Sequence, residues 1–402
     1  MRRSPLIAVY LTVFIDLLGF SIILPLLPYY AERYGATGAW VGALLTAYAA
    51  MQFLSAPILG RLSDRYGRRP ILLVSLAGSA AGLVLTGLAH SLWLLLLARI
   101  IDGASGGSIA TAQAYIADAT PPEERARYMG LLGAAVGLGF TLGPGIGGAL
   151  NVFGFSTAAF AAAALSTANL CFAALKLSET RRCAGGATGA LPAPREIAAT
   201  LREPALGRTL WAGFLATFAF AGLEATYALF GQRYFGLTGG GFAALFTYIG
   251  VLGIVTQGFL VRRLARRFGE ARLAAASAGL LALTLLVTAA ARTLPTAIVV
   301  ITLLALGQGL LSPMLPALLS LASSADEQGH TLGIGQALQA AARAIGPIVA
   351  GALFDLSASL PYLAGGALTL LATLLLLRVR LPARVSASSP REAVAAQSDF
   401  DP

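Results

Sequence analysis

The sequence has few charged residues and very few cysteines and histidines for its length. Only 11% of its 402 residues are charged, and it contains two cysteines and two histidines. Cys171 lies in an apolar run and Cys183 in a polar segment, so no disulfide framework is expected. His90 and His330 stand apart at the ends of apolar runs, which excludes a histidine-rich metal site. We therefore expect no metal centre.

The motifs of nucleotide binding and acyl chemistry are missing as well. The sequence has no P-loop, so ATP is not expected as the direct energy source, and no nucleophile elbow indicates a hydrolase. We expect neither a cofactor nor an enzymatic activity. The formal net charge of +10 would suit a nucleic-acid partner. The basic residues lie in short segments between apolar runs, however, which argues against nucleic acid and favours a role in membrane topology.

Long apolar runs dominate the sequence. The chain is 57% hydrophobic and its mean hydropathy is +0.77, far outside the range of soluble domains. Runs of about 20 apolar residues cross a bilayer as helices, because hydrocarbon tolerates no unpaired backbone groups. The first run is too long for the core of a signal peptide and is counted as a span. The twelve predicted spans are residues 6–28, 40–60, 71–89, 92–118, 126–149, 156–177, 209–231, 242–261, 272–291, 294–322, 331–354 and 361–379.

The basic residues predict the orientation of these spans. Of the 28 lysines and arginines, 23 fall in the N-terminal tail, in the loops that follow even-numbered spans, or in the C-terminal tail. By the positive-inside rule, both termini are expected in the cytoplasm. The expected location is the inner, cytoplasmic membrane of the cell, with the lipid bilayer as surroundings.

The longest loop divides the chain into two six-helix halves, residues 1–178 and 209–380. Residues 179–208 contain a glycine-rich stretch and three prolines, and they are expected to form a flexible cytoplasmic linker. Residues 381–402 are rich in serine and alanine, and they are expected to form a disordered cytoplasmic tail.

Two matches relate the halves to each other. The segment Arg263–Gly269 follows the similar segment Arg61–Gly67 by 202 residues, and the pair Gly346 and Pro347 follows Gly143 and Pro144 by 203. The alternative is that these short glycine-rich segments match by chance. We interpret the common offset as an internal repeat of two pseudo-symmetric halves.

The loop between the second and third spans carries the most specific motif. It reads Gly60-Arg-Leu-Ser-Asp64-Arg65-Tyr-Gly67-Arg68-Arg69. This loop closely resembles the signature loop of the major facilitator superfamily, and the resemblance extends over nearly the whole chain. It implies an all-α membrane protein with twelve transmembrane helices in two pseudo-symmetric six-helix halves. The chain is most similar in pattern to the twelve-helix drug:proton antiporter branch, which includes tetracycline and multidrug resistance exporters.

In that superfamily the loop clamps the cytoplasmic helix ends and stabilises the outward-facing state. We expect Asp64 to lie against the positive N-terminus of a neighbouring helix, and Arg65 or Arg69 to pair with a carboxylate, for which Asp118 is the candidate. Ordinary anchoring by positive charge is the alternative. The residues expected in this conformational latch are Gly60, Asp64, Arg65, Gly67, Arg68, Arg69 and Asp118.

The fifth span is rich in glycine. Its spacing resembles the antiporter motif of the superfamily, which favours export by antiport, whereas plain helix packing is the alternative. The residues that carry the resemblance are Gly139, Gly143, Pro144, Gly147 and Gly148.

Four ionisable residues within spans are candidates for proton coupling. Asp16, in a first span similar to that of tetracycline and multidrug antiporters, would be costly to ionise near the bilayer centre, so its protonation is expected to be coupled to conformation. A helix cap or an interhelical hydrogen bond is the alternative. Arg99 and Asp102 resemble a fourth-helix motif linked to proton transfer, and their spacing equally suits a simple ion pair. Glu224, in the seventh span, is the second candidate for protonation.

In the superfamily, helices one, four, seven and ten line the substrate cavity. Arg343, in the eleventh span, is expected either to meet Glu224 or another acid across that cavity or to attract an anionic substrate. Glutamines at similar depth offer neutral hydrogen bonds, although glutamines also join helices to each other. The further cavity candidates are Gln52, Gln113, Gln308, Gln336 and Gln339.

Together these features predict a secondary active transporter. The expected function is export of small amphipathic or drug-like molecules in exchange for protons, by alternating access of a monomer, with the proton gradient as the energy source. Two alternatives stay open. One is an importer or facilitator of a metabolite or organic anion, and the other is a membrane sensor or scaffold that does not transport.

Overall fold

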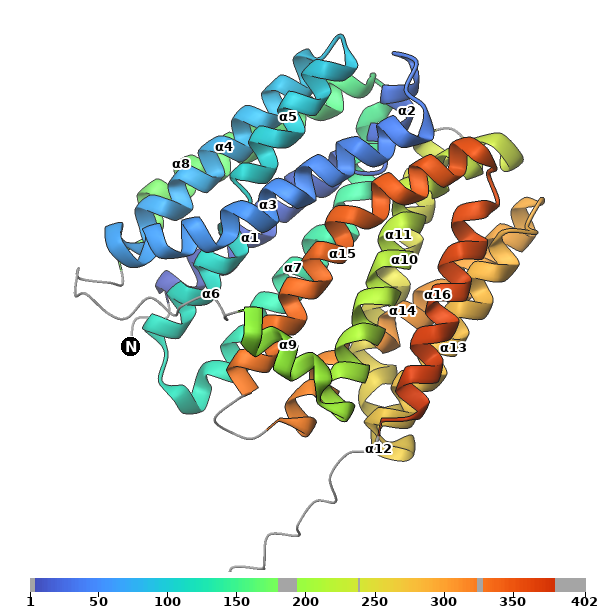
Figure 1. Ribbon diagram of the computed structural model, residues 1–402. Helices are drawn as coiled ribbons and strands as arrows, with labels where there is room; N and C mark the ends of the chain where they lie inside the picture. The colour runs from blue at the N-terminus through green and yellow to red at the C-terminus, as the bar shows by residue number, and fades with distance from the viewer. Residues whose placement is uncertain (1–3, 180–193, 238, 324–327, 380–402) are drawn as a thin grey trace, which may run out of the picture.

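A computed structural model describes residues 4–179, 194–237, 239–323 and 328–379, and every regular element in these ranges is a helix (Figure 1). By length and composition, twelve segments of the described chain are able to cross a membrane. The predicted all-α fold with twelve spans is confirmed. Most helices run past the predicted ends of the spans, since the amphipathic turns at the membrane surface continue the helix.

The N-terminal half contains eight helices. They are α1 (Ser4–Ile23), α2 (Leu27–Glu32), α3 (Gly38–Tyr66), α4 (Arg68–Leu88), α5 (Leu92–Ala104), α6 (Ser108–Ala119), α7 (Pro122–Asn151) and α8 (Phe155–Lys176). The first span comprises α1 and α2, and the fourth comprises α5 and α6. The break between α5 and α6 falls at residues 105–107, in the middle of the fourth span.

The C-terminal half repeats this plan with a different break. Its helices are α10 (Pro204–Phe235), α11 (Gly239–Val255), the π-helical turn η1 (Thr256–Leu260), α12 (Val261–Phe268), α13 (Glu270–Thr288), α14 (Leu294–Ala322), α15 (Gln328–Leu356) and α16 (Leu360–Leu377). In this half it is the eighth span that is interrupted, by the π-helical turn between α11 and α12.

Backbone geometry supports the internal repeat. Gly67 separates α3 from α4 with φ 104° and ψ 154°, and Gly269 separates α12 from α13 with φ 78° and ψ 155°. Positive φ values of this kind favour glycine, because a side chain would be strained there. Helix contacts repeat too, since Gly143 of α7 packs on α1 and Gly346 of α15 packs on α10. Equivalent turns and helix contacts therefore recur in the two pseudo-symmetric halves.

The halves are joined at one end of the bundle, which we name the far end. The start of α1 and the end of α16 lie at the opposite end, named the terminal end (Figure 1). At the far end the carboxylate of Asp355 accepts hydrogen bonds from the amides of Gly38 (2.6 Å) and Ala39 (2.9 Å). Tyr29 donates to the carbonyl of Ala228 over 3.3 Å. One continuous apolar core also connects the far-end part of the N-terminal half with the C-terminal half. The bundle is thus closed at its far end.

The predicted linker is partly helical. Residues 194–202 form α9 (Pro194–Arg202), and α10 already begins at Pro204. Gly207 packs so closely on the carbonyl of Leu201 that a side chain there would overlap it. The described part of the linker therefore differs from a flexible connector. Residues 180–193 and the predicted disordered tail, residues 381–402, lie outside the described residues, so their flexibility stays a prediction.

Candidate functional site

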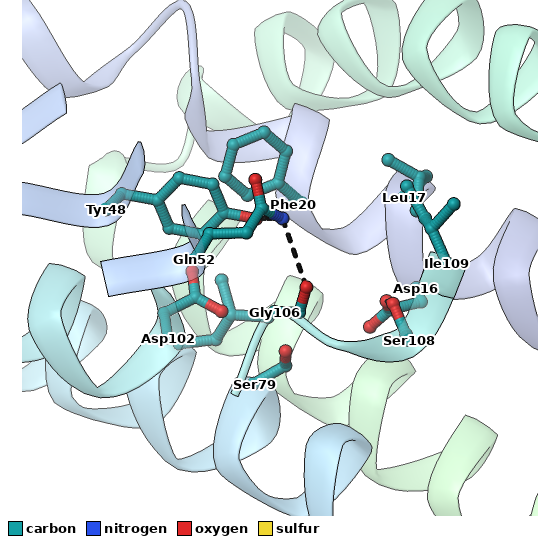
Figure 2. Close-up of a pocket in the computed structure, with 11 residues that line it drawn as sticks. Asp16, Leu17, Phe20, Tyr48, Gln52, Ser79, Asp102, Gly106, Ser108 and Ile109 are labelled. Atoms are coloured by element: carbon teal, nitrogen blue, oxygen red, sulfur yellow. Dashed lines mark hydrogen bonds between the residues drawn. The ribbon is translucent and has the colours of Figure 1, made fainter. Parts of the chain in front are cut away.

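A small polar chamber lies inside the N-terminal half, among α1, α3, α4, α5 and α6 (Figure 2). Its volume is about 20 Å³, enough for roughly one water molecule. The residues that line it are Asp16, Leu17, Phe20, Tyr48, Gln52, Ser79, Leu83, Asp102, Gly106, Ser108 and Ile109. Two of the predicted proton-coupling residues, Asp16 and Asp102, thus share one chamber.

The helix break of the fourth span supplies the hydrogen bonds of this chamber. Ser108, the first residue of α6, donates from Oγ to Oδ2 of Asp16 over 2.5 Å. From the other side, Nε2 of Gln52 donates to the carbonyl of Gly106 over 3.3 Å, the bond drawn dashed in Figure 2. Gln52 was expected in a substrate cavity and instead fixes the break beside Asp16. The break therefore presents polar groups where a continuous helix would present none.

Asp102 and Arg99 are almost fully buried behind this chamber. Their side chains are 4% and 2% exposed, and Nη2 of Arg99 lies 3.3 Å from Oδ2 of Asp102. That nitrogen donates to Oγ1 of Thr86 over 3.0 Å. Within the described part of the chain, Oδ2 of Asp102 and Nε of Arg99 have no hydrogen-bond partner. The expected ion pair is present, but its alignment leaves the carboxylate with unused hydrogen-bonding capacity.

The glycines of the fifth span bring α7 into close contact with α1, next to the chamber. Side chains at Gly139 and Gly143 would collide with residues 14–21 of α1, and one at Gly147 would overlap the carbonyl of Ile22. Oγ of Ser21 donates to the carbonyl of Gly139 over 2.8 Å. Pro144 is buried within α7 and Gly148 is half-buried. Three glycines of the predicted motif thus form one close helix contact that runs from Phe14 to Ile22 and includes the turn of α1 that carries Asp16.

A larger cavity of about 300 Å³ lies between α7 of the N-terminal half and α10, α11, η1 and α14 of the C-terminal half. Of the predicted cavity residues, only Gln308 lines it. Gln113 and Gln336 are exposed on α6 and α15, and Gln339 is half-buried on α15. The cavity borders spans five, seven, eight and ten, whereas spans one, four, seven and ten were expected.

Gln257 also lines this cavity, and sequence reasoning missed it. The eighth span was predicted to end at residue 261, which would place Gln257 near the membrane surface. In the structure α12 extends the helix to Phe268, so Gln257 lies well inside the span. The signal available in the sequence was the amphipathic arginine-rich segment Val261–Phe268, which continues the helical pattern.

Glu224 and Arg343 are neighbours across two helices of the C-terminal half. Glu224 is half-buried on α10, and Arg343 is exposed on α15. They interact electrostatically, although no ion pair within 4 Å joins them in the described residues. Of the two expectations for Arg343, the proximity to Glu224 is met, and the exposed guanidinium keeps the anion-binding alternative open.

Comparison with known proteins identifies the family of this chain. The family model described as Major Facilitator Superfamily matches residues 9–289 and 245–400. The chain belongs to the major facilitator superfamily. It is 33% identical over 380 residues to the tetracycline resistance protein, class C, of Escherichia coli, covering 92% of this chain and 95% of that protein. It is 27% identical over 372 residues to multidrug resistance protein 2 of Bacillus subtilis (strain 168), covering 91% and 92%.

Comparison with a solved structure supports the same family assignment. The crystal structure of the human organic anion transporter MFSD10 (TETRAN) has a TM-score of 0.71 and 28% identity, over 93% of this chain and 99% of that one. As a major facilitator protein, the chain is a multi-pass membrane transporter of a small molecule and not an enzyme. The described residues contain no group of three or more histidine, cysteine or acidic side chains that could hold a metal ion.

The superfamily's signature loop differs in one contact from expectation. Among the described residues Arg68, and neither Arg65 nor Arg69, pairs with the carboxylates: its Nη2 lies 2.8 Å from Oδ1 of Asp64, and its Nε lies 2.8 Å from Oδ2 of Asp118. Gly67 turns the chain so that Arg68, the first residue of α4, points back over the end of α3. Asp118 is the predicted carboxylate, but its partner was predicted wrongly.

The neighbouring residues of the loop make other contacts. The amides of Arg68 and Arg69 at the N-terminus of α4 donate to the carboxylate of Glu179 over 2.9 and 3.2 Å. The guanidinium of Arg69 donates to the carbonyl of Ala174 over 2.7 Å, and Arg65 stacks on Tyr66. The helix N-terminus thus binds a carboxylate, as expected for the loop, but that carboxylate belongs to the segment after α8.

We expect Arg68→Ala to destabilise the folded protein far more than Arg65→Ala. Arg68 is buried between two carboxylates, and loss of one partner of a buried pair costs about 3–5 kcal/mol. Both carboxylates are partly exposed, which places the expected loss near the lower end of that range. Thermal unfolding of the purified variants in detergent measures the difference. Equal melting temperatures would contradict a structural role of Arg68.

Proposed function

We propose that this protein is a proton-coupled antiporter that exports small amphipathic or drug-like molecules across the cytoplasmic membrane by alternating access. The supporting observation is the chamber that Asp16 of the first span shares with Asp102 of the fourth, next to the close contact of α1 and α7. The likeness to tetracycline and multidrug resistance proteins supports export of drugs. The proton gradient supplies the energy, and no cofactor takes part.

In this mechanism Asp16 exchanges the proton. When its carboxyl group is neutral, the chamber holds one negative charge fewer, and the charge of Asp102 is left with its partner Arg99 behind the chamber. In its ionised form it receives the short hydrogen bond from Ser108, at the break between α5 and α6. Because the break joins the two halves of the fourth span, the charge of Asp16 acts directly on the geometry of that span. Proton binding and release therefore favour different arrangements of the N-terminal half.

Arg99 and Asp102 tune this exchange in our proposal, and Glu224 is the second proton-binding residue. Asp102 lies close enough to interact electrostatically with Asp16. Glu224 lies on α10, the counterpart of α1 in the internal repeat, and faces the positive charge of Arg343. One acid on the first helix of each half gives each half its own response to the proton gradient.

The orientation follows from the distribution of charge. The arginine-rich turns between α3 and α4 and between α12 and α13, the start of α1 and the end of α16 belong to the terminal end, so we place the terminal end in the cytoplasm. The closed far end then faces the outside, and the structure represents an inward-facing state. In this state Asp64 is paired with Arg68 inside its own half. We propose that the loop acts as a latch that stabilises the opposite, outward-facing state.

Transport of an organic anion is the second candidate function. The exposed guanidinium of Arg343 and the likeness to the organic anion transporter MFSD10 favour it. The third possibility, a sensor or scaffold that does not transport, is set aside because the family and the similar solved structure are those of transporters. We further propose that the protein works as a monomer.

Proton flux in proteoliposomes tests the proposed function. The purified protein is reconstituted into liposomes that enclose a pH-sensitive dye and hold an inward-directed gradient of tetracycline, chloramphenicol or tetraphenylphosphonium. Antiport predicts that entry of a substrate drives protons out and raises the internal pH, and that export-deficient bacteria expressing the protein resist the same compounds. Flux with organic anions alone would support the second candidate, and no flux with any compound would refute transport by proton exchange.

A further inference from the structure

Among the residues that the structure describes, none that lines the 300 Å³ cavity between the halves is charged. Its lining residues are Gly137, Phe140, Thr141, Phe220, Ile249, Gly250, Gly253, Ile254, Gln257, Leu304, Ala305, Gln308, Gly309 and Ser312. The volume lies at the lower bound of typical small-molecule sites, and an apolar wall with a few polar groups is typical of them. An ion placed here would lose its hydration without gaining a counter-charge, which is strongly unfavourable.

The polar groups of the wall are neutral donors and acceptors. Gln257 and Gln308 each carry an amide that both donates and accepts. Pro313 and Pro316 lie within α14 and have no amide hydrogen. Neither proline is able to donate the helical bond to the residue four positions before it, which is Gly309 and Ser312 respectively. Two backbone carbonyls of the cavity wall therefore lack their usual helical donor.

The π-helical turn η1 places Gln257 in this wall. The amide of Val261 donates to the carbonyl of Thr256, five residues earlier, so one extra residue is inserted into the helical turn. The first residue of this turn, Thr256, packs against Gly309 of α14. A Cβ atom added at Gly309 would lie 3.1 Å from the side chain of Thr256. π-Helical turns of a single repeat occur often at functional sites, because they change the direction of one side chain.

The walls of the cavity belong to both halves of the transporter. α7 comes from the N-terminal half, and α10, α11, η1 and α14 come from the C-terminal half. At the far-end limit of the cavity, a side chain at Gly250 would collide with Thr141 across the boundary between the halves. A bound molecule in this cavity therefore contacts both halves, and its binding energy depends on how they are arranged.

We propose that this cavity binds the substrate, that the substrate is an uncharged amphipathic molecule with both hydrogen-bond donors and acceptors, and that Gln257 and Gln308 determine its specificity. The proposal rests on the proposed transport function and names its substrate class. It places recognition on spans five, seven, eight and ten, and it assigns no substrate contact to Arg343. Organic anions and lipophilic cations are excluded from the cavity because the described residues of its wall offer them no counter-charge.

Equilibrium binding of radiolabelled chloramphenicol, an uncharged antibiotic, to the purified protein in detergent tests the site. A side chain at Gly137 or Gly253 would meet no atom within 4 Å of its Cβ, so leucine is accommodated at either position and projects from the cavity wall. Gly137→Leu and Gly253→Leu are expected to abolish binding. Gly133→Leu, one turn earlier on α7 and outside the cavity, is the matched control, since its Cβ also meets no atom.

The amides are tested separately. Gln257→Ala and Gln308→Ala are each expected to weaken chloramphenicol binding roughly tenfold, the effect of one lost hydrogen bond in a largely apolar site. Asn151→Ala, which removes an amide side chain from the end of α7 outside the cavity, is expected to bind as the wild type does. Tetraphenylphosphonium and benzylpenicillin are expected not to compete with chloramphenicol.

The outcomes separate this inference from the transport function. Saturable binding that is lost in both leucine variants of the cavity and kept in the control supports the site. Absence of saturable binding, unchanged binding in the leucine variants, or competition by either ion overturns it. Proton flux in proteoliposomes is measured independently, so a transporter with intact flux and no binding in this cavity keeps its function and loses this substrate site. The melting temperature of each variant shows that it is folded.

Discussion

Asp16→Asn is expected to reduce substrate-driven proton flux to the level of empty liposomes while exchange of labelled for unlabelled substrate continues. Asparagine keeps the size of the side chain and accepts the hydrogen bond from Ser108, but it cannot bind or release a proton. The chamber would then hold only Asp102 with its counter-ion Arg99, whose charges nearly balance. Coupling is lost, whereas the rocking of the halves and the substrate site are kept.

Two further variants give this experiment its controls. Glu124→Gln removes an exposed carboxylate near the terminal end of α7, outside the chamber, and is expected to leave flux unchanged. Glu224→Gln tests the second proton-binding residue, and a partial loss of flux is expected. If Asp16→Asn retains full proton flux, Asp16 is a structural hydrogen-bond acceptor, and the proton pathway lies elsewhere.

The length and composition of the apolar runs were sufficient to predict the fold. Each of the twelve predicted spans corresponds to a candidate membrane span, because a helix that crosses hydrocarbon needs a run of that length regardless of its partners. The internal repeat was also visible, since Gly67 and Gly269 are needed at equivalent turns with positive φ. A glycine required by backbone geometry leaves a trace in the sequence at a fixed position.

The rotation of each helix was not predictable in the same way. Gln308 lines the large cavity, yet Gln113 and Gln336 are exposed, although all three lie in apolar spans. A helix that is apolar all round carries no contrast between a lipid face and an inner face, so its polar residues cannot be assigned to one side. The π-helical turn that places Gln257 in the cavity has no sequence signature at all.

The signature loop shows a related limit. Its charges identified the correct cluster, but the arginine that pairs with Asp118 depends on where α3 ends and α4 begins. The helices meet at Gly67, so Arg68 turns back to Asp64 and Asp118. A prediction of helix ends that is uncertain by two residues cannot distinguish Arg68 from its neighbours.

A substitution in the contact between α3 and α15 at the far end is expected to have the second large effect on transport. Gly351 packs on the carbonyl of Gly38, and Gly42 packs on the carbonyl of Pro347, so close that a side chain at Gly351 or Gly42 would overlap the opposite backbone. Asp355 adds its two hydrogen bonds to the N-terminus of α3, where a negative charge is favourable. The far end is thus able to close only because neither helix carries a side chain at the point of contact.

Gly351→Leu is therefore expected to hold the transporter open at its far end and to abolish transport, since alternating access requires that end to close. A cysteine at Thr46, whose hydroxyl lies at this contact, reports the state in a background in which Cys171 and Cys183 are replaced by serine. A membrane-impermeant maleimide should label it several-fold faster in Gly351→Leu. Gly333→Leu, on the same helix with no atom within 4 Å of the added Cβ, should behave as the wild type. Equal labelling of both variants would show that this contact does not control the far end, and the closed state would then depend on α7 and α11, which meet at Gly145 and Thr247.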